Sequence, residues 1–333
     1  MIELKNLTKD EKLEKVSKKC GEIIDTVCDI YVGDRKNIEK LLAASIANGH
    51  VLFEDYPGLG KTTLAKIFSI SLGLEYSRIQ FTPDLLPSDI TGNMIWRDKG
   101  FFEFKKGPIF SNVVLADEIN RAPPKTQSAL LESMEEKQVT VEDETHKLDS
   151  PFFVIATQNP IEHEGTYPLP EAQMDRFLMK TSIGYPRDKE EEIEIQERRI
   201  EWKEDDPSDL VEPVINKEYF QKIQKMVEND IYVDKCILDY IAEIVRRTRK
   251  AEAVEVGSRP RGCLALLKLS RAYALIKGRD FVTPDDVKLF VTEAISHRII
   301  LGMEYSLEGV KSKDILEHII REVPVPKEFE PDM

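Results

Sequence analysis

Apolar and polar residues alternate in two different ways along the chain. Up to about residue 185, short apolar runs rich in β-branched or aromatic residues are separated by helix-like stretches and followed by polar or turn residues. This alternation of apolar runs and helix-like stretches is typical of a parallel sheet with helices on both faces, so we predict an α/β fold. The candidate strands are HVLFED (50–55), EYSRIQF (75–81), NVVLADE (112–118), PFFVIATQN (151–159) and the weaker FLMKTSI (177–183).

Two segments of this first region have the pattern of β-hairpins instead. The first is IWRDKGFFEF, which we expect to turn at Asp98, Lys99 and Gly100. The second is QVTVEDETHKL, in which apolar and polar positions alternate before an acidic turn. The expected hairpins therefore cover about residues 90–106 and 138–149.

After Pro186 the pattern becomes helical. A highly charged helix, DKEEEIEIQERRIEW, is followed by WKEDDPSDLVEP, which has the composition of an exposed connection. Further on, DKCILDYIAEIVRRTRK spaces its apolar residues by three and four, and Thr283 with Pro284 gives a helix-start signal. We predict three parts: an α/β core over 1–186, a connecting helix and linker over 187–215, and an α-helical domain over 216–333.

Composition narrows the functions that this fold could serve. A content of 41% hydrophobic and 32% charged residues is that of a globular protein. The formal net charge of −14 argues against a surface built to bind many phosphates, so nucleic acid is an unlikely partner. No signal-like or membrane-length apolar run occurs, so we expect no membrane insertion and a cytoplasmic location. The four cysteines and five histidines lack zinc-like or redox spacing.

The strand at 50–55 leads into EDYPGLGKTTLAK, which follows the phosphate-loop pattern G-x-x-x-x-G-K-[ST] except that Asp55 replaces the first glycine. Backbone N–H groups from Gly58 onward would point at a β-phosphate, helped by the N-terminus of the following helix. Lys61 would reach the β- and γ-phosphates, and Thr62 would hold Mg²⁺. An inward-facing Asp55 at roughly 6 Å would oppose each phosphate charge by roughly 3 kcal/mol at an effective dielectric of about 20. Because aspartate tolerates unusual backbone angles and bonds nearby amides, we expect Asp55 to face away and to lower ATP affinity only modestly.

Polar residues end two further strands. In NVVLADEINR, four apolar residues lead to Asp117, at the end of a strand where open α/β sheets bind their ligands. Asp117 would complete the Mg²⁺ site, and Glu118 is suited to polarise the water that attacks the γ-phosphate. In PFFVIATQNP, Asn159 could orient that water, because its amide both donates and accepts hydrogen bonds.

Together these residues resemble the MoxR family of AAA+ ATPases. Three segments are similar to segments of that family in their residues and in their order along the chain: VLADEINRAPPKTQSALLESMEE, ATQNPIEHEGTYPLPEAQMDRF and GSRPRGCLALLKLSRAYALIKGRDFVTPDDV. The resemblance extends from about Val32 to near Ile300. The resemblance implies a P-loop AAA+ αβα core with a C-terminal all-α lid. It also implies ATP hydrolysis with Mg²⁺ between the subunits of a ring, expected to be a homo-hexamer.

The resemblance also assigns roles by position. Lys61, Thr62, Asp117 and Glu118 match Walker A and B, Asn159 matches sensor 1, and Arg176 matches the arginine finger offered to the neighbour's ATP. Arg261 matches the sensor 2 arginine, which would bring the lid down on the phosphates, although nearby Arg259 departs from the pattern. The expected nucleotide-binding residues are Val32, Gly33, Pro57, Gly58, Leu59, Gly60, Lys61, Thr62, Thr63, Asp117 and Arg261. The metal ligands would be Thr62 and Asp117.

The resemblance further implies chaperone-like remodelling or activation of partner proteins, often ones with a von Willebrand factor A domain. The two hairpins match the family clade's inserts, which would face the ring pore or a client.

Three other functions remain as alternatives. A phosphate-loop kinase or GTPase fits less well, since NKEY at 216–219 lacks the aspartate of N-K-x-D. An ATP-binding assembly scaffold with little hydrolysis is kept open by Asp55. A DNA-linked AAA+ motor has only RRTRK at 246–250 as local support, which the dipole of a helix end also explains.

Overall fold

The computed structural model describes residues 8–97, 101–142, 144–160 and 165–326. Its centre is a five-stranded, fully parallel sheet with the strand order β2-β5-β8-β1-β9. The strands are β1 (Val51–Glu54), β2 (Tyr76–Gln80), β5 (Val113–Asp117), β8 (Phe153–Gln158) and β9 (Met179–Thr181). Each lies within one of the five predicted apolar runs, so the predicted parallel sheet is confirmed.

Both faces of the three central strands, β1, β5 and β8, are buried, which explains why they read as continuous apolar runs, while the edge strands β2 and β9 are only partly buried. Successive side chains point to opposite faces, so Phe53 and Leu115 join one apolar cluster while Leu52 and Val114 join another. The helices of this core are α1 (Lys9–Cys28), α2 (Arg35–Ile46), α3 (Lys61–Ser71), α4 (Pro87–Thr91), α5 (Pro124–Glu136) and α6 (Glu171–Met174), with the 3-10 turns η1 (Pro108–Phe110) and η2 (Ile119–Arg121).

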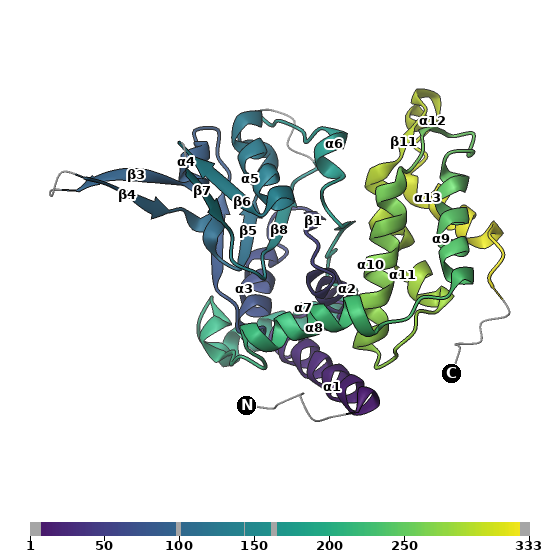
Figure 1. Cartoon of the computed structure of the whole chain (residues 1–333), viewed down its shortest axis with the longest axis horizontal. Coiled ribbons are helices and arrows are strands. Elements are labelled where there is room, and N and C mark those ends of the chain that lie inside the picture. The colour runs from purple at the N-terminus through teal and green to yellow at the C-terminus, as the bar shows by residue number, and fades with distance from the viewer. Residues whose placement is uncertain (1–7, 98–100, 143, 161–164, 327–333) are drawn as a thin grey trace.

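Two antiparallel hairpins extend from this core at the predicted positions. One pairs β3 (Gly92–Arg97) with β4 (Phe101–Lys106), and the other pairs β6 (Gln138–Val141) with β7 (Glu144–Lys147). The expected turn at residues 98–100 lies outside the described residues. The β3–β4 hairpin projects far from the sheet (Figure 1), and the exposed rings of Trp96 and Phe102 pack edge to face on it, with their centroids 4.9 Å apart.

The C-terminal part is mostly helical. It contains α7 (Lys189–Trp202), η3 (Pro207–Leu210), α8 (Lys217–Asp230), α9 (Lys235–Thr248), α10 (Pro260–Ile276), α11 (Pro284–Ile295), η4 (Ser296–Arg298), α12 (Met303–Leu307) and α13 (Ser312–Glu322). As predicted, α11 begins after the N-cap Thr283 with Pro284 in its first turn. The pattern did not predict the pairing of β10 (Val254–Val256) with β11 (Ile300–Leu301), because these strands are very short and only partly buried.

The lid packs directly on the core. Residues of α10 and α11 share one apolar cluster with α1 and α2, and α10 contacts both α1 and α2 (Figure 1). Among the described residues, no helix is both long and apolar enough to cross a membrane.

The connection after α7 is less exposed than its charged composition predicted. Pro207, Ser208 and Val211 are buried, and Lys66 of α3 forms a 2.5 Å ion pair with Asp206. The expectation of an exposed connection is therefore wrong for its centre. The acidic residues dominate the composition, while the few apolar residues between them pack against α3.

Candidate functional site

The phosphate loop lies between the end of β1 and the start of α3. Gly58 and Gly60 have φ angles of 86° and 73°, in the left-handed region that side chains disfavour. Gly60 is the N-cap of α3, so the helix N-terminus opens toward the loop. Lys61 Nζ donates to the carbonyl oxygens of Asp55, at 3.0 Å, and Tyr56, at 2.7 Å. Burial lowers the pKa of Lys61, and the negative charges of Asp55, Asp117 and Glu118 only partly offset this by raising it.

The Asp55 carboxylate is buried and bonds to the chain that follows β9. It accepts hydrogen bonds from Ser182 Oγ, from Ile183 N at 2.7 Å and from Gly184 N at 3.3 Å. Three donors thus hold the carboxylate toward the chain that follows β9. These hydrogen bonds support the expected outward orientation of Asp55, although the residue also lines the phosphate cavity, and its effect on ATP affinity stays a prediction.

Asp117 lies at the carboxyl end of β5, where two neighbouring strands hold its carboxylate. Thr157 Oγ1 of β8 donates to Oδ1 at 2.6 Å, and Arg78 Nη2 of β2 donates to Oδ2 at 2.7 Å. The same Thr157 hydroxyl accepts from the backbone amide of Glu118 at 2.8 Å. The pattern of a single strand could not identify Arg78 or Thr157, because their contact with Asp117 depends on the order of strands in the sheet.

Glu118 has an unusual backbone for a residue with a side chain, with φ 56° and ψ 50°. Such a conformation costs energy and is found disproportionately at functional sites. Its Oε2 accepts from Gln80 Nε2 at 2.7 Å and from Arg121 Nη1 at 2.8 Å. Gln80, like Arg78 and Thr157, is a site residue that the sequence pattern did not reveal, and it is aligned with Asp117 in the β2–β5 register.

These residues surround one cavity of about 360 Å³. Thr62 and Asp117 both line it and supply the hydroxyl and carboxylate oxygens that suit Mg²⁺, so the donor set fits this ion. Asn159 lines the same cavity, together with Glu118. Of the predicted site residues, the cavity brings together Pro57, Gly58, Leu59, Gly60, Lys61, Thr62, Thr63, Asp117, Glu118 and Asn159.

A second, more apolar cavity of about 430 Å³ adjoins the first and shares Gly58 to Gly60 and Thr63 with it. Val32 and Gly33 line it, as expected for residues that would contact a base. Trp202 of α7 and Pro207 of the connection line it as well, and the sequence analysis had assigned neither to the site. Asp34, which also lines this cavity, accepts from Lys36 N at 2.9 Å and caps α2.

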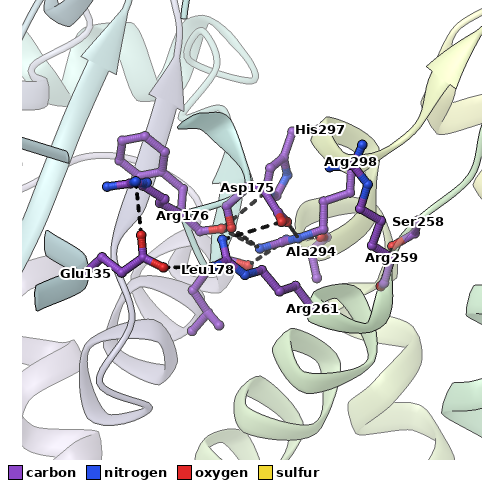
Figure 2. Close-up of polar contacts among 11 residues, drawn as sticks. Glu135, Asp175, Arg176, Leu178, Ser258, Arg259, Arg261, Ala294, His297 and Arg298 are labelled. Atoms are coloured by element: carbon purple, nitrogen blue, oxygen red, sulfur yellow. Dashed lines mark hydrogen bonds and ion pairs between the residues drawn. The ribbon is translucent and has the colours of Figure 1, made fainter. Parts of the chain in front are cut away.

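Arg176 and Arg261 lie together at the junction of core and lid, and neither lines the phosphate or base cavity. Both form ion pairs with Glu135 of α5, Arg176 at 3.0 Å and Arg261 at 2.8 Å (Figure 2). Arg261 therefore does not line the phosphate cavity of its own chain in this structure, and its role as the sensor 2 arginine stays a prediction. From the first turn of α10, Arg261 instead reaches Glu135 and lies 3.6 Å from Asp175. Arg259 is the N-cap residue of α10 and lines a different cavity.

Comparisons with known proteins agree with this geometry. Residues 50–179 match the family described as "ATPase family associated with various cellular activities (AAA)", and residues 246–319 match the AAA lid domain. The chain is 48% identical to the uncharacterized protein YeaC of Bacillus subtilis (strain 168), over 92% of this chain and 94% of that protein. It is 38% identical to chaperone MoxR1 of Mycobacterium tuberculosis, over 90% of this chain and 80% of that protein.

The crystal structure of a protein from Cytophaga hutchinsonii is similar to this chain along nearly its whole length. It superposes with a TM-score of 0.88 at 43% sequence identity, covering 95% of this chain and 98% of the other. Sequence relatives and fold lead to the same assignment. The chain belongs to the MoxR family of AAA+ ATPases.

Proposed function

We propose that this protein hydrolyses ATP to ADP and phosphate between adjacent subunits of a ring, expected to be a hexamer. The observation that carries the proposal is the separation of two groups of residues in one chain. Lys61, Thr62, Asp117 and Glu118 surround the phosphate cavity, whereas Arg176 and Arg261 are paired elsewhere. Since the arginines lie outside the phosphate and base cavities of their own subunit, they would complete the site of a neighbour in a head-to-tail ring.

Each residue then has a defined task. Lys61 and the amides after Gly58 would bind the β- and γ-phosphates, while Thr62 and Asp117 would hold Mg²⁺, which shields the phosphate charge. Glu118 would accept a proton from the attacking water, and Asn159 would help to orient it. Arg176 and Arg261 from the neighbour would stabilise the charge that develops on the γ-phosphate.

The turnover of ATP by the purified protein with Mg²⁺ tests the hydrolysis itself. We expect measurable turnover in the wild type and loss in both Lys61→Ala and Glu118→Gln, with Glu118→Gln still binding ATP. Wild-type protein that binds ATP without turnover would instead favour the assembly scaffold. Turnover of a small-molecule phosphate acceptor, or of GTP in preference to ATP, would favour the kinase or GTPase.

A mixing experiment tests the arrangement between subunits. Arg176→Ala keeps its own phosphate site and loses the arginine, whereas Glu118→Gln keeps the arginine and loses its own site. Each variant alone should be inactive, and a mixture should regain turnover because some interfaces combine an intact Glu118 with an intact Arg176. Failure of the mixture to regain turnover would exclude this arrangement.

For the biological role, we propose chaperone-like remodelling or activation of a partner protein, with a von Willebrand factor A domain protein as the expected client. The exposed Trp96 and Phe102 on the β3–β4 hairpin support a protein-binding role, because exposed aromatic residues are common at interfaces. Pull-down with an immobilised von Willebrand factor A domain tests it, with a Trp96→Ala, Phe102→Ala double variant as control. Salt-sensitive DNA binding in place of client binding would favour the DNA-linked motor.

A further inference from the structure

Arg298 is a nearly fully buried arginine that connects the lid to the chain segment carrying Arg176. It lies at the end of η4, just after α11, and its side chain is only 4% exposed. Nε donates to Asp175 Oδ1 at 2.7 Å, and Nη2 donates to the carbonyl oxygens of Phe177, at 2.6 Å, and Asp175, at 3.2 Å. Nη1 donates to the carbonyl oxygens of Leu178, at 3.2 Å, and Ala294. All five guanidinium N–H groups therefore have acceptors (Figure 2).

Four of these five hydrogen bonds cross from the lid to the core segment 175–178. His297, the preceding lid residue, adds a contact of 3.2 Å between its Nε2 and the carbonyl oxygen of Phe177. Burial lowers the pKa of both His297 and Arg298. Burying a guanidinium costs free energy unless hydrogen bonds compensate it. Because all five N–H groups of Arg298 have acceptors, the positions of the lid and of the 175–178 segment are fixed relative to each other.

One of the acceptors of Arg298 also links it to Arg261 and Arg176. Asp175, which Arg298 holds, also lies 3.6 Å from Arg261 Nη1. Arg261 in turn shares Glu135 with Arg176, the residue directly after Asp175. Both the backbone that carries Arg176 and the carboxylate that faces Arg261 are therefore fixed from the lid by one side chain.

We infer that Arg298 is a positioning residue: it fixes the 175–178 segment against the lid, so that Arg176 and Arg261 are presented together to the ATP of a neighbouring subunit. This inference rests on the proposed function. The contact requires arginine, because its rigid planar guanidinium can donate to several carbonyl groups at once. Lysine at the same position would keep the charge but could not reach these successive carbonyl oxygens. Arg298 would thus act on the site of the next subunit and leave the site of its own subunit intact.

The test uses full-length Arg298→Lys and, from the core side of the contact, Asp175→Asn. Each variant alone should bind fluorescent ATP with wild-type affinity, while its ATP turnover falls by roughly a hundredfold, the scale expected for a misplaced catalytic group. Mixed in equal amounts with Glu118→Gln, each should regain about a quarter of the wild-type rate, since about one interface in four then combines two intact halves. The matched control is Arg279→Lys, because Arg279 bonds Asp286 through both Nη atoms entirely within the lid. It should keep its turnover.

Three results would overturn the inference. If Arg298→Lys and Asp175→Asn hydrolyse ATP at the wild-type rate, the guanidinium contact with the 175–178 segment is not needed. Loss of turnover without recovery in the mixture, while the Arg176→Ala mixture recovers, would place the effect in the variant's own site or in its folding. If the Arg176→Ala mixture also fails to recover although the wild type hydrolyses ATP, the arrangement between subunits is wrong, and this inference fails with it.

Discussion

The carboxylate of Asp55 accepts a 2.7 Å hydrogen bond from the backbone amide of Ile183, so the residue that replaces a phosphate-loop glycine joins β1 to the chain after β9. A residue that would oppose phosphate if it faced inward is instead a structural link. We therefore expect Asp55→Gly to raise ATP affinity by less than tenfold, which is about 1.4 kcal/mol. The same change should lower the free energy of unfolding by about 1–3 kcal/mol, because it leaves buried amides without an acceptor.

Titration with a fluorescent ATP analogue and thermal unfolding measure the two effects separately. An affinity gain of tenfold or more would mean that the carboxylate faces the phosphates in solution. Unchanged affinity would contradict the expected modest penalty, and unchanged stability would contradict the structural role.

Gln80 offers a prediction about catalysis, since its Nε2 holds Glu118 Oε2 at 2.7 Å. Gln80→Ala should lower kcat several-fold and leave ATP affinity nearly unchanged, because the carboxylate loses a partner that orients it while the phosphate-binding groups stay intact. Gln80→Glu should lower kcat further, since it sets a second negative charge beside Glu118. Steady-state ATPase assays over a range of ATP concentrations separate kcat from KM. A wild-type kcat in both variants would show that the hydrogen bond has no catalytic role.

Trp202 provides an optical test of the base cavity. The chain has two tryptophans, Trp96 on the exposed hairpin and Trp202 in the wall of the cavity with Val32 and Gly33. In Trp96→Phe, all tryptophan emission comes from Trp202, and ATP binding should change it because a purine ring would lie close to the indole. Trp202→Phe should lose most of the response. An ATP-dependent signal that survives in Trp202→Phe and disappears in Trp96→Phe would place the base elsewhere.

His50 predicts how stability depends on pH. Its Nδ1 accepts from Val154 N at 3.0 Å, its Nε2 lies 3.2 Å from the carbonyl oxygen of Met134, and burial lowers its pKa from 6.5 to about 4. The unfolded state therefore binds more protons than the folded state between these values, so this contribution is complete above pH 6.5 and is lost as the pH falls toward 4. The loss from pH 7 to pH 5 should be about 2 kcal/mol.

Urea denaturation at pH 7 and pH 5 measures this loss. His50→Asn, which keeps an acceptor for the Val154 amide, should show a smaller difference between the two pH values than the wild type. The exposed His318 is the matched control, and His318→Asn should behave as the wild type does. An equal difference in His50→Asn and the wild type would mean that His50 is not the group responsible.

The sequence predicted what depends on local patterns. The central strands β1, β5 and β8 are short apolar runs buried on both faces, and the phosphate loop is a continuous motif between a strand and a helix. The contacts that escaped prediction join distant parts of the chain. Gln80 reaches Glu118 only because β2 lies next to β5, and Arg298 is 123 residues away from Asp175. The ion pair of Arg261 with Glu135 also joins distant segments, and a motif gives the residue and not the subunit that it serves.

The connection between core and lid also forms a wall of the base cavity. Trp202, Asp205 and Pro207 line that cavity, and the lid follows them in the chain. A rotation of the lid that displaces these residues would change the width of the opening through which a nucleotide enters and leaves. A partner that binds the lid could thereby set the rate of nucleotide exchange without touching the phosphates.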